Sequence, residues 1–489
     1  MNIECKNLIA GEWVDGPDST PNLCPADTDQ HLGSAPVSGS QAAHDAIAAA
    51  KAAQPAWAAV TAPARGAILY NLVRLLEQNT DRLAEALALE EGKILAEAKG
   101  EVAKTARYVE YAAGDCRRMA GMTVPSEIPG TWAMTAWNPL GVIGLITPWN
   151  FPVCIPLWKI APAIAAGNAV VLKPAPETPA TAHIIGELCL EAGVPPGVVN
   201  IVHGDAEPAK AIIEHPDVAA ISFTGSTEVG LAIEARCGAL HKPIQCEMGG
   251  KNPIIVLDDA DIAAAAAAAA KGGFGSTGQR CTATSRAIVM ESVADAFAAE
   301  LAAHAATIRP GHPLDPSTTM GPSVSERQLD QVLKYMEIGR GEAEIPFGGH
   351  RLTEGALARG YFPAPTLLDR VSATARVATE EIFGPVLSMI RVKSVEEAIA
   401  VANGVRYGLT GSVYTSDLSR AFQVIQHLEA GITHVNNPTI GGEAHLPFGG
   451  IKHTGTGPRE MGPGAWKFYA EEKAIYINHA GGSRKGNLY

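Results

Sequence analysis

The sequence predicts an α/β protein built on parallel, doubly wound sheets. Short apolar runs alternate along the chain with longer segments of helical periodicity, the pattern of strand–helix–strand units. This alternation occurs over residues 141–248 and begins again at residue 253. With 489 residues, the chain is also too long for one hydrophobic core. We therefore expect two large α/β domains and a small additional element.

Composition and charge exclude several classes of protein. With 47% hydrophobic and 18% charged residues, the chain has the composition of a soluble globular protein. The net charge of −13 argues against nucleic acid or an anionic membrane as partner. No apolar run approaches the roughly 20 residues that span a bilayer, and no secretory signal is evident. Eight cysteines lie scattered without a C-x-x-C pair, which fits reduced thiols and a cytoplasmic location.

The N-terminal part predicts surface strands followed by four helices. Residues up to about 40 are rich in Pro, Gly, Asp and Thr, which indicates strands and turns. Ser40 is placed to cap a helix through Trp57, Pro63 suits the first turn of the second, and Thr80 is placed to cap the third. The fourth carries an apolar stripe of Val102, Ala106, Val109 and Ala113. We expect these helices to serve packing.

Residues 119–139 predict a strand arm that leaves the globule. Their Pro and Gly content rises, and residues 131–137 alternate rather than repeat helically. An arm of this kind needs a partner strand, and the C-terminal residues 473–477 are a second candidate strand. We therefore expect a homodimer or homotetramer.

The remaining chain predicts two strand–helix series. The first has buried strands at residues 141–146, 169–172, 198–202, 219–223 and 243–246, with a helix at 178–192, and is a nucleotide-binding candidate. The second has strands at 253–257, 287–290, 386–392, 411–414 and 431–436. Its helices are expected at 293–306, 395–402 and 418–428, and Asp261 is placed to cap an alanine-rich helix through residue 270.

Cys281 is the candidate nucleophile. It ends a glycine-rich loop, and glycine backbone lets a substrate approach a side chain closely. The charge of Arg280 next to it would favour the thiolate, and Glu247, beside the pair Gly249-Gly250, is a candidate general base. The fourteen histidines, His445 included, show no H-E-x-x-H or other ligand spacing, so we expect no metal site.

Three further turns follow predicted strands. The turn from Gly225 to Gly230, with Ser226, opens a helix and suits a phosphate, although a simple tight turn explains it equally because it lacks the lysine of a P-loop. Lys173 is placed to reach a ribose or phosphate, or is merely solvated. Asn150 stands in a stiff loop between two prolines, as an oxyanion donor or as part of a packed turn.

Together these motifs resemble the aldehyde dehydrogenase superfamily, from about Leu8 to Ile477. Seven pieces occur in the family's order: Pro148-Trp149-Asn150-Phe151-Pro152, Lys173-Pro174, Phe223 to Gly230, Glu247-Met248-Gly249-Gly250-Lys251, Gly278-Gln279-Arg280-Cys281, Glu381-Ile382-Phe383-Gly384-Pro385 and Pro447-Phe448-Gly449-Gly450. The resemblance implies a Rossmann-type NAD(P)-binding domain of residues 1–118 and 140–249 and a catalytic domain of residues 250–452. It implies a small β oligomerisation element of residues 119–139 and 453–489.

The resemblance also implies a role for each matching residue. Cys281 would attack an aldehyde, Asn150 and the Cys281 N–H would hold the oxyanion, and Glu247 would activate water against the thioester. A carboxylate at Glu247 favours hydrolysis of the thioester over its transfer to CoA. An acyl-transferring enzyme remains an alternative. Seven positions would bind NAD or NADP: Trp149, Lys173, Gly225, Ser226, Gly230, Glu381 and Phe383.

One position departs from the family pattern. NAD-preferring relatives commonly carry a glutamate three residues after the lysine of Lys173-Pro174, where this chain has Pro176. That carboxylate would bind the adenosine ribose and repel a 2′-phosphate. We therefore expect NADP⁺ to be admissible, and because Glu177 is the next residue, dual use stays open.

The substrate is predicted only by class. Trp158, Ile155 and Phe448 match positions that line the family's apolar substrate channel, and Arg280 is placed to bind a substrate carboxylate or to form a structural ion pair. A carboxylated semialdehyde is the leading hypothesis. Aromatic, aliphatic or sugar-derived aldehydes compete with it, and a non-catalytic scaffold of the same fold is the alternative from another class.

Overall fold

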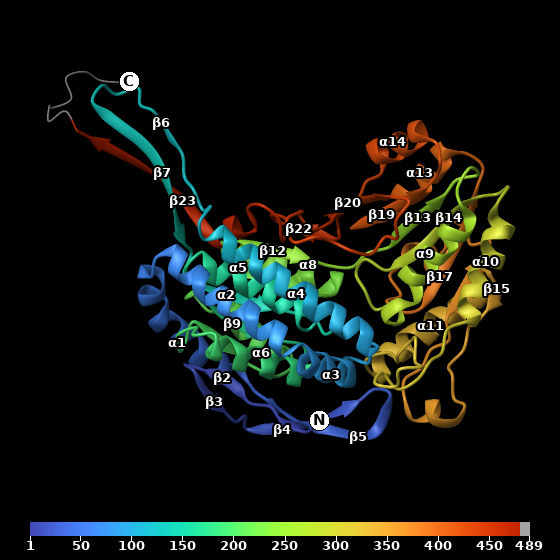
Figure 1. Ribbon diagram of the computed structural model, residues 1–489, viewed down its shortest axis with the longest axis horizontal. Helices are drawn as coiled ribbons and strands as arrows, with labels where there is room; N and C mark the ends of the chain where they lie inside the picture. Colours follow the sequence, from blue (N-terminus) through green and yellow to red (C-terminus); the bar gives the residue numbers. More distant parts are fainter. Residues whose placement is uncertain (480–489) are drawn as a thin grey trace.

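The computed structural model describes residues 1–479. Two parallel sheets, each covered by helices, lie next to each other, and a narrow three-stranded arm extends away from the first (Figure 1). The N-terminal strands run along the lower face of both halves in the same view. The architecture is thus the predicted α/β class with two sheet-centred units and an arm.

The first sheet has eight strands in the order β22-β12-β11-β8-β9-β10-β2-β3. The five central strands β12 to β10 are parallel, while β22, β2 and β3 pair antiparallel at the edges. Their bounds are β22 Gly455–Thr456, β12 Ile244–Glu247, β11 Val218–Thr224, β8 Val142–Ile146, β9 Ala169–Lys173, β10 Val199–Ile201, β2 Asn7–Ile9 and β3 Glu12–Val14.

Helices cover both faces of this sheet. One apolar core joins it to α1 (Ser40–Ala59), α7 (Ala206–Glu214) and α8 (Thr227–Ala239). The other face packs on a second core with α2 (Ala62–Gln78), α3 (Thr80–Glu91), α4 (Leu95–Asp115), α5 (Cys154–Ala165) and α6 (Pro179–Glu191). A strand buried on both faces reads as a continuous apolar run, which is why the five parallel strands of this sheet could be located in the sequence.

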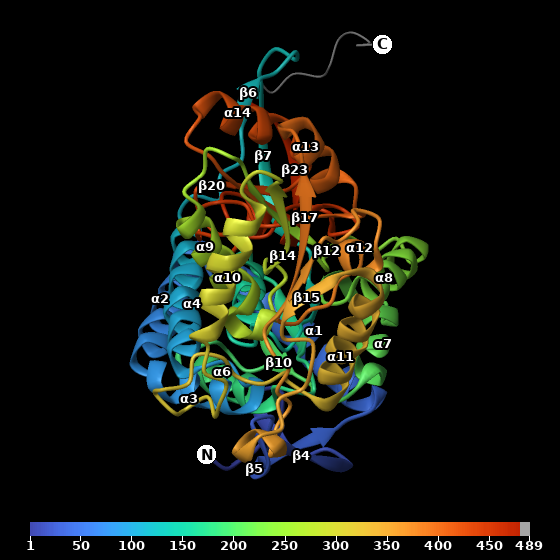
Figure 2. The same ribbon diagram turned by 90° about the vertical axis from the view of Figure 1, so that its right-hand side faces the viewer.

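The second sheet has seven strands in the order β15-β16-β17-β14-β13-β19-β20, all parallel except β15. In Figure 2, α9 and α10 lie on one side of β14 and β17, and α11 and α12 on the other. The strand bounds are β15 Glu344–Phe347, β16 Thr366–Asp369, β17 Val386–Val392, β14 Thr284–Met290, β13 Asn252–Val256, β19 Thr410–Tyr414 and β20 Ile432–Val435. The helices are α9 Ile262–Phe274, α10 Ala294–Ala306, α11 Glu326–Glu342, α12 Arg376–Thr379, α13 Val395–Asn403 and α14 Leu418–His427.

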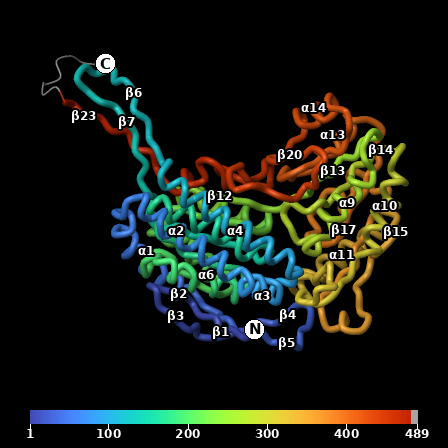
Figure 3. The backbone as a smooth tube through the Cα atoms, in the orientation of Figure 1, coloured from blue at the N-terminus to red at the C-terminus, as the bar shows by residue number. Residues whose placement is uncertain are grey.

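The arm consists of β6 (Thr123–Pro125), β7 (Thr131–Pro139) and β23 (Ala470–Asn478). Strands β7 and β23, far apart in sequence, pair antiparallel along their full length (Figure 3). Smaller elements are the sheet of β1 (Ile3–Glu4), β5 (Asp27–Val37) and β4 (Asp18–Cys24), the pair β18 (Tyr407–Gly408) and β21 (Ile451–Lys452), and the 3₁₀ turns η1 Gly275–Gly278, η2 Gly355–Arg359 and η3 Ala465–Tyr469.

Most predicted elements are confirmed, and two predicted caps are wrong. Ser40 and Thr80 are the first residues of their helices, and the caps before them, Gly39 and Asn79, make no side-chain cap hydrogen bond. The Thr80 hydroxyl instead donates to carbonyls of the preceding helix, at Leu76 and Glu77. Asp261 does cap α9, accepting from the Ala264 N–H at 3.0 Å.

One part of the C-terminal segment packs on the first sheet, and the other part belongs to the arm. Strand β22 pairs with β12, and Phe468 and Tyr469 of η3 belong to the core of the first sheet, so only residues from Ala470 onward join the arm. The arm strand predicted around residues 473–477 is thus present as β23, Ala470–Asn478. Residues 480–489 of the predicted oligomerisation element lie outside the described part of the chain.

Candidate active site

The predicted site residues follow four neighbouring strands of the first sheet. Strands β12, β11, β8 and β9 are parallel and adjacent, so their carboxyl ends meet at one edge. Glu247 and Lys173 are the last residues of β12 and β9, while the Asn150 loop and the Gly225 turn follow β8 and β11. The second unit contributes the loop carrying Cys281 and the segment before β17 that carries Glu381 and Phe383.

Cys281 and Asn150 lie in one hydrogen-bonded structure. The Asn150 Nδ2 donates to the carbonyl of Gln279 at 3.1 Å, and the Asn252 Nδ2 donates to the carbonyl of Cys281 at 2.7 Å. Cys281 is half-buried, while the other seven cysteines are buried. The loop before it passes through left-handed backbone, and a Cβ at Gly278 would come within 2.2 Å of the Gly384 carbonyl oxygen. Glycine is therefore required there.

The electrostatic surroundings of Cys281 differ from the prediction. Burial, followed by the nearby carboxylates of Glu247 and Glu381, raises the pKa of the Cys281 thiol to about 12. The guanidinium of Arg280 points to other partners, Glu97 at 2.8 Å and the Ser276 hydroxyl at 2.8 Å. Arg280 is therefore engaged by Glu97 and Ser276, and the pKa of Cys281 is raised where a stabilised thiolate would have lowered it.

The Glu247 carboxylate rests against a glycine turn. Its Oε2 accepts from the N–H of Gly450 at 3.3 Å, and a Cβ at Gly449 would lie 2.2 Å from its Oε1. Burial, and next the charge of Glu460, raises the pKa of Glu247 well above its usual value. The two glycines thus leave the space that this carboxyl group occupies.

A buried ion pair next to Glu247 was missed from the sequence. The Lys159 ammonium pairs with Glu460 and donates to the Ser222 hydroxyl at 2.7 Å. Both charged side chains are buried, and Lys159 is the single charge in the apolar helix α5. A lone lysine in such a helix is a signal that a buried partner exists, but the sequence does not reveal which carboxylate it is.

A second buried network holds the Asn150 loop. The Lys93 ammonium donates to the carbonyl of Asn150 and to Glu101, both at 2.7 Å, and lies 4.1 Å from the centre of the Phe151 ring. The other oxygen of Glu101 accepts from the N–H groups of Val153 and Cys154. These contacts fix the loop that carries the amide, and no local sequence pattern predicted them.

The predicted cofactor residues line the same edge. The Lys173 side chain is 7% exposed, and its ammonium has no hydrogen bond or ion pair within residues 1–479, so it fits a hydroxyl or phosphate ligand. Burial lowers its pKa. Ser226 precedes α8 without capping it, which leaves the first N–H groups of the helix for an anion.

Two more predicted cofactor residues lie opposite this helix. Glu381 accepts from the N–H of Gly250 at 2.9 Å, and burial raises its pKa to about 7. The rings of Phe383 and Trp149 meet edge to face, with centres 5.5 Å apart. A Cβ at Gly249 would come within 2.2 Å of the free oxygen of Glu381. Glu381 thus contacts the turn after β12, and Phe383 contacts the loop after β8.

An apolar cluster packs against Cys281. Its buried members include Tyr108 and Phe448, and Trp158 lies between these two, with ring centres 5.8 and 5.4 Å away. Cys154 belongs to the cluster, whereas the predicted Ile155 is buried outside it. Tyr108 comes from α4 and could not be found by its own sequence context. Within residues 1–479, no group of three metal-ligating side chains and no helix able to cross a membrane occurs.

Comparison with known proteins agrees with this geometry. The model of the aldehyde dehydrogenase family matches residues 13–475. An alpha-ketoglutaric semialdehyde dehydrogenase of Bacillus subtilis is 41% identical and covers 96% of this chain and 97% of its own. An alpha-ketoglutarate semialdehyde dehydrogenase of Haloferax volcanii is 41% identical and covers 98% of this chain and 100% of its own. A 2,5-dioxopentanoate dehydrogenase of Saccharolobus solfataricus is 40% identical over 96% and 98%.

Solved structures agree along the whole chain. An NADP-dependent enzyme of E. coli is 38% identical with a TM-score of 0.93, covering 97% of this chain and 98% of that one. A betaine aldehyde dehydrogenase of Staphylococcus aureus in complex with NAD⁺ is 32% identical with a TM-score of 0.96, covering 100% and 98%. The chain therefore belongs to the aldehyde dehydrogenase family and is an NAD(P)-dependent aldehyde dehydrogenase.

Proposed function

We propose that this aldehyde dehydrogenase oxidises a carboxylated semialdehyde, α-ketoglutarate semialdehyde (2,5-dioxopentanoate) in the first place, to the dicarboxylic acid. The observation that carries the proposal is that three relatives, each about two-fifths identical over nearly the whole chain, bear the name of this activity. The hydrogen bond from the Asn150 Nδ2 to the Gln279 carbonyl supports the chemistry, because it holds the amide donor against the loop that carries Cys281.

In the proposed mechanism, the Cys281 sulfur attacks the aldehyde carbon as its thiolate, after its proton has left to solvent. The carbonyl oxygen becomes an oxyanion, which accepts hydrogen bonds from the Asn150 Nδ2 and the Cys281 N–H. When bound, NAD(P)⁺ would supply the hydride acceptor that lets the Cys281-bound carbon be oxidised to the thioester. Lys173, Ser226 and Glu381 would bind the cofactor's hydroxyl and phosphate groups, and Phe383 would support its ring.

Hydrolysis requires Glu247 to leave its resting place at Gly449-Gly450. The carboxylate would then take a proton from a water that attacks the thioester, which releases the acid and returns the thiol. The neighbouring glycine supports this movement, because a Cβ at position 449 would lie 2.2 Å from the Glu247 Oε1 and would crowd the carboxyl group. Lys159 and Glu460 are positioning residues for this base, since Glu460 adjoins it and contributes to its raised pKa.

The substrate proposal is tested with purified enzyme and a panel of aldehydes. We expect kcat/KM for 2,5-dioxopentanoate to exceed that for pentanal, the neutral aldehyde of equal length, by at least tenfold. Succinic semialdehyde should fall between them, and benzaldehyde and sugar aldehydes below. A preference for a neutral aromatic or aliphatic aldehyde would overturn the substrate proposal while leaving the family assignment intact.

For the cofactor we propose dual use of NAD⁺ and NADP⁺. Pro176 is exposed and carries no charge that would repel a 2′-phosphate, and the carboxyl group of Glu177 has a pKa raised by burial. Related structures include an NADP-dependent enzyme and an NAD⁺ complex. Pro176→Glu should lower kcat/KM for NADP⁺ by about tenfold or more, from charge repulsion, and change that for NAD⁺ little.

We also propose that the arm joins subunits into a homodimer or homotetramer. It exposes five large apolar side chains, Met122, Val124, Trp132, Tyr476 and Ile477, and strand β20 leaves one edge of the second sheet unpaired within residues 1–479.

A cytoplasmic location is proposed because all eight cysteines are free and seven of them are buried.

A further inference from the structure

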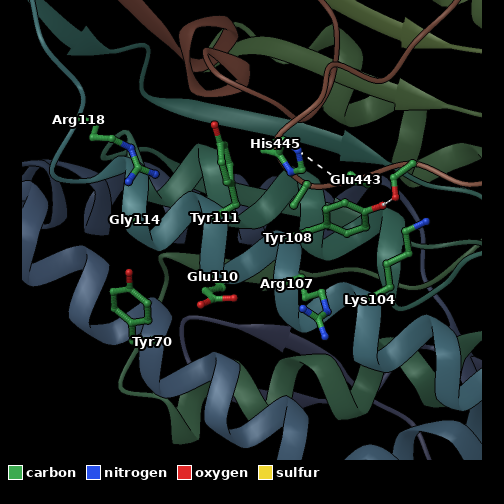
Figure 4. Close-up of a pocket in the computed structure, with 12 residues that line it drawn as sticks. Tyr70, Lys104, Arg107, Tyr108, Glu110, Tyr111, Gly114, Arg118, Glu443 and His445 are labelled. Atoms are coloured by element: carbon green, nitrogen blue, oxygen red, sulfur yellow. Dashed lines mark hydrogen bonds and ion pairs between the residues drawn. The ribbon is translucent and has the colours of Figure 1, made fainter. Parts of the chain in front are cut away.

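A polar pocket opens beside the apolar cluster that contains Cys281. It has a volume of about 590 Å³ and lies between α4 and the loop at residues 442–445. Figure 4 shows Lys104, Tyr108 and Glu443 at one end of this pocket and Arg118 at the other. Three of its lining side chains are cations, Lys104, Arg107 and Arg118, whereas two are carboxylates, Glu110 and Glu443.

Lys104 is the partly buried cation of this pocket that makes no ion pair within residues 1–479. Burial lowers the pKa of Lys104 more than the nearby carboxylate of Glu443 raises it, and Glu443 pairs with His445 at 3.4 Å. Arg118 is paired with Asp115 at 3.1 Å, and Arg107 is exposed. The Lys104 ammonium makes no hydrogen bond or ion pair within residues 1–479, and its aromatic neighbour Tyr108 lies 5.9 Å away. Burial lowers the pKa of Lys104, so its charge lacks full hydration and gains from an anion placed next to it.

The pocket shares a wall with the apolar cluster that packs on Cys281. Tyr108 and Ala444 line the pocket and also belong to the cluster that packs on Cys281. Trp158, which lies between Tyr108 and Phe448, has a buried Nε1 without an acceptor in the described residues. A ligand extending from Cys281 past Trp158 would therefore meet an apolar wall, then one unused donor, and then the ammonium of Lys104.

We infer that Lys104 is the anchor for the substrate carboxylate and sets the preference for acidic semialdehydes. This inference rests on the proposed function and gives Lys104 one of the two roles predicted for Arg280, the other being the structural ion pair that the structure shows. Arg280 is already bound to Glu97 and Ser276, so its charge is compensated. Lys104 forms no ion pair within the described residues, and an alkyl chain with a terminal carboxylate fits an apolar cluster that borders a pocket lined by such a cation.

The test compares Lys104→Met with Lys99→Met, its matched control. Lys99 lies on the same helix, but its ammonium is exposed and already paired with Asp81 at 2.7 Å. KM and kcat are measured for 2,5-dioxopentanoate and for pentanal. Loss of a charged hydrogen bond should raise KM for the acid about 10- to 100-fold. The kcat for the acid and kcat/KM for pentanal should stay within about threefold in both variants, and Lys104→Arg should restore most of the preference.

The outcomes separate the inference from the function on which it rests. If the wild-type enzyme does not discriminate between the two aldehydes, the substrate proposal fails and the anchor with it. If the wild-type enzyme discriminates and Lys104→Met does so equally, Lys104 is not the anchor, while the substrate proposal stands. Should Lys104→Met not fold, the wild-type enzyme decides: KM for the acid must rise with added NaCl more steeply than KM for pentanal, and equal salt responses overturn the inference.

Discussion

The buried carboxyl group of Glu247 is the residue on which the choice between hydrolysis and acyl transfer depends. Glu247→Gln keeps the shape of the side chain and removes the base. Hydride transfer comes before hydrolysis, so we expect one equivalent of reduced cofactor per site in a rapid burst, followed by steady turnover lowered about 10²- to 10⁴-fold. Stopped-flow absorbance measures both phases.

Glu300→Gln is the matched control, because Glu300 is an exposed carboxylate on α10. It should leave burst and turnover unchanged. Unimpaired steady turnover in Glu247→Gln would favour the alternative in which the thioester passes to CoA or phosphate.

The raised pKa of Cys281 makes its reactivity depend on pH. Only the thiolate is alkylated, and a thiol pKa near 12 means that the thiolate fraction grows tenfold per pH unit over the measurable range. We therefore expect the rate of iodoacetamide modification of the cofactor-free enzyme to rise with unit slope between about pH 7 and 10. Cys281→Ser, in which the buried thiols remain, should react much more slowly. A rate that levels off below pH 8 would show that the thiolate is already formed there.

At the scale of single residues, the sequence predicted which residues carry the chemistry better than it predicted the groups that surround them. Cys281, Asn150 and Glu247 stood out because glycines and prolines fixed the backbone around them. The ion-pair partner of Arg280 could not be predicted, because Glu97 lies 183 positions away in the sequence. Only the packing of α4 against the Cys281 loop brings the two side chains together. Charge partners of this kind follow from tertiary structure.

At the scale of elements, the loop after β8 depends on a helix pair that carries no catalytic group. Lys93, between α3 and α4, donates to the Asn150 carbonyl and to Glu101, which accepts from the first N–H groups of α5. In Lys93→Met the buried Glu101 loses its partner, so we expect the free energy of unfolding to fall by about 3–5 kcal/mol. We also expect kcat to fall by about tenfold with KM little changed, because the oxyanion donor is less well placed.

Urea unfolding and steady-state kinetics measure the two effects. Lys99→Met, whose ammonium is exposed, should change the free energy of unfolding by less than about 1 kcal/mol. A stable Lys93→Met enzyme with wild-type kcat would contradict the role given to this network.

Strands were predictable from the sequence where helices cover both faces of the sheet. Strand β17 was predicted with its observed bounds of 386–392, because a strand covered by helices on both sides is mostly apolar, here at five of its seven residues. Helix α11 was not predicted, since its apolar stripe is diluted by charged residues and by Gly339 and Gly341. The caps at Ser40 and Thr80 failed because a capping residue type also serves as the first residue of a helix.

At the scale of the whole molecule, the arm is the part whose surface the single chain leaves uncovered. Trp132 on β7 and Ile477 on β23 face each other in register and are 60% and 46% exposed. Alternation in the sequence predicted this arm, but what it pairs with lies beyond one chain. We expect the double variant Trp132→Arg/Ile477→Glu to keep the arm paired through opposite charges across the strands, while it removes the apolar surface.

If this surface joins subunits, the variant should elute from size exclusion at lower mass, as light scattering measures, with the far-UV circular dichroism of the wild type. Burying two charges against a partner's apolar surface or strand edge costs several kcal/mol. A loss of that size is enough to dissociate subunits that associate at micromolar concentration. Glu472→Gln, exposed on β23 opposite Trp137, is the control and should keep the wild-type mass. An unchanged mass in the double variant would mean that the subunits associate through another surface, and a monomeric wild-type protein would remove the need for the arm to have a partner at all.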